Sequence, residues 1–84
     1  MKPRDVLRKA LAGSKNIRFN DVADLAPAFG FRESRVRGSH HIFIHPQVPE
    51  LLNLQSVRGQ AKPYQVRQLL RLVERHNLAL REGP

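Results

Sequence analysis

The chain has 84 residues, too few for two independent hydrophobic cores, so we expect a single domain over residues 1–84. It contains no cysteine, which excludes a disulfide framework and a thiolate zinc site. The 15 lysine and arginine residues against 7 acidic residues leave a net charge of +8, which indicates an anionic partner: nucleic acid first, then an acidic protein or an anionic membrane surface.

The first third of the chain carries two helical patterns. Pro3–Leu11 repeats apolar residues at the helical period, and a glycine-serine pair follows as a stop signal. After a basic linker, residues 20–29 repeat the pattern, with Asn20 or Asp21 as the expected N-cap and a glycine after the last turn. Pro27 lies inside the second pattern, so we expect a kink or a break there.

From residue 31 onward the apolar period changes from 3.6 to 2. Residues 31–37 and 40–45 are predicted strands joined by a Gly-Ser turn, which indicates a hairpin. A proline-bracketed loop leads to a third predicted strand at residues 51–55. Pro63 then begins a helix whose apolar stripe ends near residue 77.

This order of elements predicts an α+β fold, a three-stranded antiparallel sheet with helices packed on one face and an extra N-terminal helix. We divide the chain into an N-terminal helical extension and basic linker (1–19), a core (20–78) and a tail (79–84). The chain begins with mixed charged and apolar residues and not with an apolar run, so we expect a cytoplasmic protein without membrane contact.

Strand alternation decides which side chains of residues 40–45 meet solvent. If Ile42 and Ile44 form the core, the alternate side chains face the open side of the sheet. These are His41, Phe43 and His45. His40 shares the parity of the isoleucines, but at the start of the strand we expect it to be only half-buried.

An exposed histidine row on a basic domain suits RNA. A histidine can accept the proton of a 2'-hydroxyl, which then attacks the adjacent phosphate, while nearby cations stabilise the developing charge. This chemistry needs no metal or cofactor. His41 and His45 share a face, but no further ligand lies near them in sequence, so we expect no metal site.

The expected RNA-binding surface combines cations near the hairpin and the last helix with residues on the exposed strand face. Its predicted members are Arg35, Arg37, Ser39, Phe43, His45, Lys62 and Arg67. The four-residue spacing of the arginines in the last helix also fits an ordinary solvated face.

The run RVRGSHHIF at residues 35–43, preceded by a helix that ends in Phe29-Gly30-Phe31, resembles the hallmark of HicA toxins. The resemblance covers roughly residues 22–78. It implies a fold like that of double-stranded-RNA-binding domains and metal-independent cleavage of mRNA by the toxin of a type II toxin-antitoxin system. It also implies a HicB-type antitoxin as partner, with DNA contacted only through the antitoxin complex.

The resemblance places the catalytic histidine in the Gly-Ser-His-His element. Alternation favours His41, which is expected on the open face, and leaves His40 as second choice. The chain departs from the family pattern at residues 1–19 and in the segment from Pro49 to Tyr64. Two other functions remain open at this point: a non-catalytic RNA-binding module, and a DNA-binding protein that inserts its arginine-rich last helix into a major groove.

Overall fold

A computed structural model describes residues 1–81, which form three helices and one four-stranded antiparallel sheet of order β1-β2-β3-β4. The elements are α1 (Pro3–Leu11), α2 (Phe19–Ala28), β1 (Arg32–Arg37), β2 (His40–His45), β3 (Val48–Val57), β4 (Gln60–Ala61) and α3 (Pro63–Arg75). The predicted α+β fold, consistent with that of double-stranded-RNA-binding domains, is confirmed together with its N-terminal helix. The two-residue strand β4 was not predicted.

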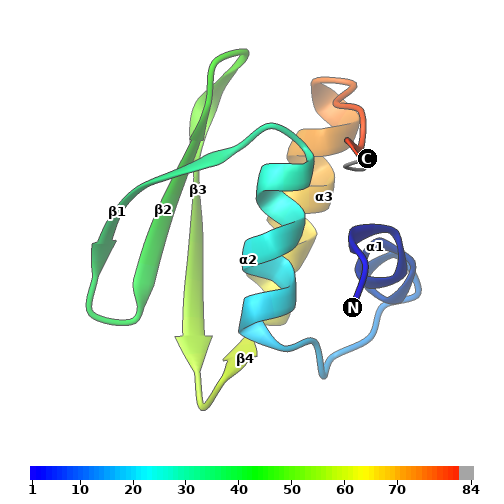
Figure 1. Cartoon of the computed structure of the whole chain (residues 1–84), viewed down its shortest axis with the longest axis vertical. Coiled ribbons are helices and arrows are strands. Elements are labelled where there is room, and N and C mark those ends of the chain that lie inside the picture. Colours follow the sequence, from blue (N-terminus) through cyan, green and yellow to red (C-terminus); the bar gives the residue numbers. More distant parts are fainter. Residues whose placement is uncertain (82–84) are drawn as a thin grey trace.

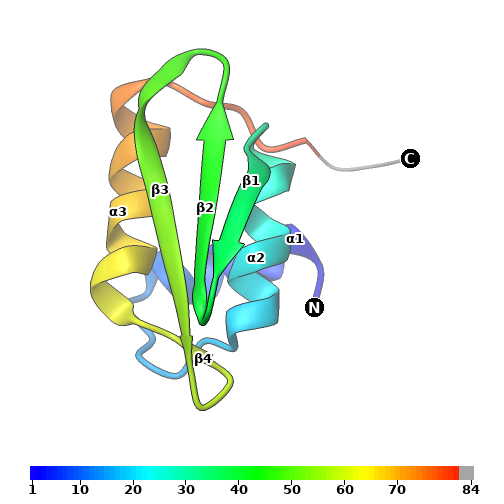
Figure 2. The ribbon, with the colours of Figure 1, turned by 90° about the vertical axis from the view of Figure 1, so that its left-hand side faces the viewer.

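The elements stack in three layers (Figure 1). The sheet forms one outer layer, α2 and α3 cover one of its faces, and α1 packs on the far side of this helix pair. Figure 2 looks onto the opposite face of β1, β2 and β3, and none of the helices lies in front of it. We call this uncovered surface the open face.

Helix α2 begins at Phe19, two residues earlier than a cap at Asn20 predicts and three earlier than a cap at Asp21 predicts. Arg18 occupies the N-cap position without a side-chain cap, so neither Asn20 nor Asp21 acts as the cap. Pro27 does not divide the helix into two pieces, because it lies in the last turn and the helix ends one residue later, at Ala28. The helix ends with Gly30 at φ 96° and with the N–H of Phe31 donating to Ala26, as in a Schellman motif.

The two tight hairpin turns use residues whose backbone matches the sheet twist. In the β1–β2 turn, Gly38 has φ 56° at the first central position, the requirement of a type II′ turn. In the β3–β4 turn, Arg58 and Gly59 both have positive φ, which is typical of type I′. Both turns lie at the same end of the sheet, close to where α2 and α3 begin (Figures 1 and 2).

Strand β3 is longer than the predicted 51–55 segment and contains Pro49. The register between β2 and β3 shifts between the pairs Phe43–Leu52 and His45–Val48, so Pro49 falls where the ladder is irregular. Proline is tolerated at such a position because no ladder hydrogen bond is lost.

The structure reverses the predicted faces of β2. Phe43 is 2% exposed and His45 is 8% exposed beneath the helices, whereas Ile42 and Ile44 are half-buried on the open face. The partner strand decides this, because Phe43 pairs with the fully buried Leu52. The prediction that Phe43 and His45 face solvent was therefore wrong.

The end of the described chain packs against the helices. Leu78 and Leu80 lie against the core, and the Arg81 N–H donates to the Ala28 carbonyl at 2.6 Å. The described part of the predicted tail is thus packed, and residues 82–84 of that tail lie outside the described residues.

Candidate functional site

Strand β2 carries three histidines, and their surroundings differ completely. His45 is buried, with its ring edge-on to Phe31 at 5.1 Å between centroids. Its Nε2 donates to the Phe29 carbonyl at 3.1 Å, and its Nδ1 accepts from the Gln47 N–H at 3.0 Å. Because a carbonyl only accepts and an amide N–H only donates, these bonds hold the neutral Nε2–H tautomer. His45 therefore has no nitrogen left for RNA, contrary to prediction.

Phe43, the other predicted RNA contact of this strand, is also unavailable. Its ring lies in the core under the helical layer, next to Leu52 and Leu54. A buried ring cannot stack on a base without opening the core, so Phe43 is removed from the RNA-binding set by the same reversal of faces.

His41 lies on the helix side, near the end of the sheet at which β2 begins. Its ring packs against Phe19, the first residue of α2, with centroids 4.6 Å apart. Its Nδ1 is 2.8 Å from Glu33 Oε1 on β1, and the histidine side chain is 24% exposed. The ionised carboxylate only accepts, so Nδ1 carries the proton and donates it. The sequence did not predict a role for Glu33, because its contact with His41 depends on the register of the hairpin.

His40 begins β2 on the open face. Its Nδ1 is 3.3 Å from Asn53 Oδ1 of β3, so Nδ1–H donates to that carbonyl oxygen and the tautomer leaves the Nε2 lone pair available. In the part of the chain that the structure describes, nothing hydrogen-bonds to Nε2. Arg37 pairs directly with His40 across the β1–β2 ladder, and paired residues share a face.

Strand β1 adds a row of cations beside His40. Arg35 pairs with Ile42 and Arg32 pairs with Ile44, so both lie on the same open face as Arg37. All three arginines are exposed. Arg32 was missed because simple alternation places residues 32 and 35 on opposite faces, whereas an irregularity between Glu33 and Arg35 brings them to one face.

The turn and the start of β2 are tied to β3 and α3 by glutamine side chains. Gln55 pairs with His40, and its Nε2 donates to the exposed Ser39 hydroxyl at 3.3 Å. The backbone N–H of Gln55 donates to Oε1 of Gln65 at 2.6 Å, and Gln65 is 3% exposed. These bonds couple the end of β3 to the first turn of α3.

The predicted cations of α3 lie outside the open face. Lys62 precedes α3 and is half-buried beside Tyr64, while Arg67 is exposed on the helix one turn later. Further along, Arg75 bonds to Glu50 at 2.7 Å and His76 bonds to the same carboxylate at 3.0 Å. A hydrogen bond from the backbone, followed by Arg75 and His76, lowers the pKa of Glu50.

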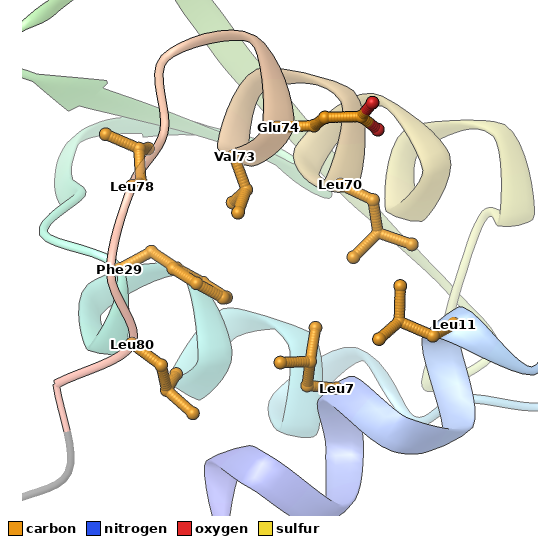
Figure 3. Close-up of a pocket in the computed structure, with 8 residues that line it drawn as sticks. All are labelled: Leu7, Leu11, Phe29, Leu70, Val73, Glu74, Leu78 and Leu80. Atoms are coloured by element: carbon orange, nitrogen blue, oxygen red, sulfur yellow. The ribbon is translucent and has the colours of Figure 1, made fainter.

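An apolar cavity of about 360 Å³ lies on the far side of α3 from the sheet (Figure 3). It is lined by Leu7, Leu11, Phe29, Leu70, Val73, Glu74, Leu78 and Leu80. Its walls are aliphatic and aromatic apart from one carboxylate, so it offers none of the histidine chemistry found on β2.

The described residues 1–81 lack two features, a cluster of metal-binding side chains and a membrane-spanning helix. They contain no group of three or more histidine, cysteine or acidic side chains placed to hold a metal ion. Among the same residues, no helix is both long and apolar enough to cross a membrane.

The family profile described as HicA toxin of bacterial toxin-antitoxin matches residues 19–74, more than half of the chain. The chain belongs to the HicA toxin family. The match contains the whole Gly-Ser-His-His element and the open face, whereas α1 and residues after 74 lie outside it. Membership makes the protein a toxin of a toxin-antitoxin pair, supports a nuclease type of activity and implies a HicB-type antitoxin as partner. Searches of curated proteins and of solved structures find no match.

Proposed function

We propose that this HicA toxin is a metal-independent endoribonuclease that cuts mRNA and thereby blocks translation, with His40 as general base. The observation that carries the proposal is the position of His40 on the open face, opposite Arg37 and held by Asn53. His40 combines an available imidazole nitrogen, a partner that orients the ring, and neighbouring positive charge.

The proposed reaction uses the RNA's own nucleophile. Nε2 of His40 takes the proton from a 2'-hydroxyl, the 2'-oxygen forms a bond to the adjacent phosphorus, and the bond from phosphorus to the 5'-oxygen breaks. The 5'-oxygen takes a proton from solvent and leaves as a hydroxyl, the proton on Nε2 passes to solvent, and the other fragment ends in a 2',3'-cyclic phosphate. Arg35 and Arg37 lie on the same face as His40 and are suited to stabilise charge on the phosphate.

The two histidines of the motif cannot serve one phosphate together. His40 and His41 are adjacent in a strand and therefore point to opposite faces of the sheet. His41 has the stronger orienting partner, the Glu33 carboxylate at 2.8 Å, which makes it the alternative base. We favour His40 because its cross-strand partner is an arginine, whereas the partner of His41 is Val36.

The test is incubation of the purified toxin with a labelled single-stranded RNA in the presence of a chelator. We expect shortened RNA with 2',3'-cyclic phosphate ends. A matched RNA with one 2'-deoxy position should resist cleavage at that position, because the nucleophile is missing. RNA that stays intact while it binds to the protein in a salt-sensitive manner would instead show a non-catalytic RNA-binding module.

In cells, expression of the toxin without its antitoxin should arrest growth and degrade mRNA. Expression of the His40→Ala variant should do neither. Growth arrest with intact mRNA would overturn the proposed substrate while leaving the toxin assignment in place.

A further inference from the structure

Among the described residues 1–81, Tyr64, in the first turn of α3, is the one exposed tyrosine or phenylalanine ring. Its side chain is 54% exposed, although the next two residues, Gln65 and Val66, are buried. The ammonium of Lys62 lies 5.8 Å from the centroid of the ring. The ammonium lies over the ring, so a base would stack on the ring face away from Lys62, with its phosphate within reach of the cation.

The ring is held at the same end of the molecule as the turn that precedes His40. Gln65 Nε2 lies 3.5 Å from the Tyr64 hydroxyl, and Gln65 Oε1 accepts from the backbone of Gln55. Gln55 in turn bonds to Ser39 and pairs with His40. Figures 1 and 2 both place the beginning of α3 at the end of the sheet where the hairpin turn lies.

Positive charge continues along this end of the molecule. Arg58 lies exposed in the β3–β4 turn, and Arg67 lies exposed one turn after Tyr64 on α3. A strand that runs from His40 past Ser39 to Tyr64 would keep its phosphates near these cations. The face of Tyr64 can take only a base that is not already stacked within a duplex.

On the basis of the RNA-cleaving function above, we propose that Tyr64 is a base-stacking subsite, which makes single-stranded RNA the substrate class of this site. The ring accepts any base, because each base has a flat face, so it selects for strandedness and not for sequence. Duplex RNA contacts the same cations but leaves the ring unstacked.

The chain offers a direct probe, because Tyr64 is its one tyrosine and it contains no tryptophan. Fluorescence excited at the tyrosine band therefore reports on this ring alone. The wild-type protein is titrated with a 2'-O-methyl single-stranded oligonucleotide, which binds as RNA does but lacks the nucleophile for cleavage. We expect the tyrosine emission to be quenched as the strand binds, and a duplex of the same sequence to leave it nearly unchanged.

Binding of the same oligonucleotide by variants provides the second measurement. Tyr64→Ala should weaken single-strand binding about 10-fold, whereas Tyr64→Phe, which keeps the ring face, should bind nearly as well as wild type. Leu11→Ala, at an exposed apolar side chain of α1, is the matched control and should change binding by less than about 2-fold.

Equal quenching by single strand and duplex, or unchanged binding by Tyr64→Ala, would overturn the subsite. Neither readout requires cleavage, so they separate this proposal from the catalytic one. A toxin that shows quenching but never cuts RNA would retain the subsite and lose the proposed reaction. A toxin that cuts single-stranded and duplex RNA equally well, without quenching, would retain the proposed reaction and lose the subsite.

Discussion

The two faces of β2 differ in what they allow a histidine to do. On the covered face, His45 uses both ring nitrogens to satisfy backbone groups, and His41 is bound by a carboxylate and an aromatic ring. On the open face, His40 has one oriented nitrogen and one available nitrogen beside arginines. Three histidines of one strand thus differ in which ring nitrogens are available, because each has its own partners and His40 lies on a different face from the other two.

We expect the largest difference in stability between an alanine variant of Phe43 and one of its neighbour Ile42. Phe43→Ala removes a ring from the core and should lower the free energy of unfolding by about 3–5 kcal/mol, a large part of the stability of a domain this small. Ile42→Ala, on the open face, should cost about 1 kcal/mol. Urea unfolding of the two variants measures the difference, and equal losses would contradict the assignment of faces.

We expect a smaller difference in stability between an alanine variant of His45 and one of His40. His45→Ala leaves the Phe29 carbonyl and the Gln47 N–H without their partner, and should cost about 2–4 kcal/mol. His40→Ala should cost less than about 1 kcal/mol, because its ring is half-buried and its single bond is to a side chain. Thermal unfolding compares them, and a His45→Ala variant as stable as wild type would show that the buried histidine is dispensable.

The smallest effect concerns acid stability through Glu50. Its pKa is lowered in the folded protein, so its contribution to stability is present above the ordinary value of 4.5 and is lost as pH falls through the folded pKa. Glu50→Gln should therefore lower the thermal midpoint near neutrality and flatten its decline between about pH 5 and about pH 3, so that the profiles of variant and wild type converge in acid. Identical profiles for variant and wild type would show that the bonds to Arg75 and His76 do not contribute to stability.

Local signals predicted most of the fold correctly. Pro63 marks the start of α3, and the glycine after α2 marks its end, because each imposes its own backbone angles without help from distant residues. The Gly-Ser turn likewise defines the β1–β2 hairpin. The N-cap of α2 failed as a prediction because two polar residues offered a capping pattern that the helix does not use.

The local sequence pattern could not predict which face of β2 is buried under the helices. Two pairs of side chains could form the core by local pattern: Ile42 with Ile44, or Phe43 with His45. The choice depends on Leu52, which comes from another strand and pairs with Phe43. The preference for His41 rested on that orientation. The pairing of His41 with Glu33 was also hidden, since the irregularity in β1 changes which of its side chains share a face.

We expect the histidine on the open face, His40, to perform the chemistry, and its neighbour His41 to be dispensable for it. The most direct test compares the initial rates at which purified His40→Ala and His41→Ala cut one single-stranded RNA in chelator, after thermal unfolding has shown that both variants are folded. We expect His40→Ala to lower the rate about 10²–10⁴-fold and His41→Ala to retain most of it. A His40→Ala variant that cuts at the wild-type rate while His41→Ala is inactive would contradict the account and assign the reaction to the Glu33–His41 pair.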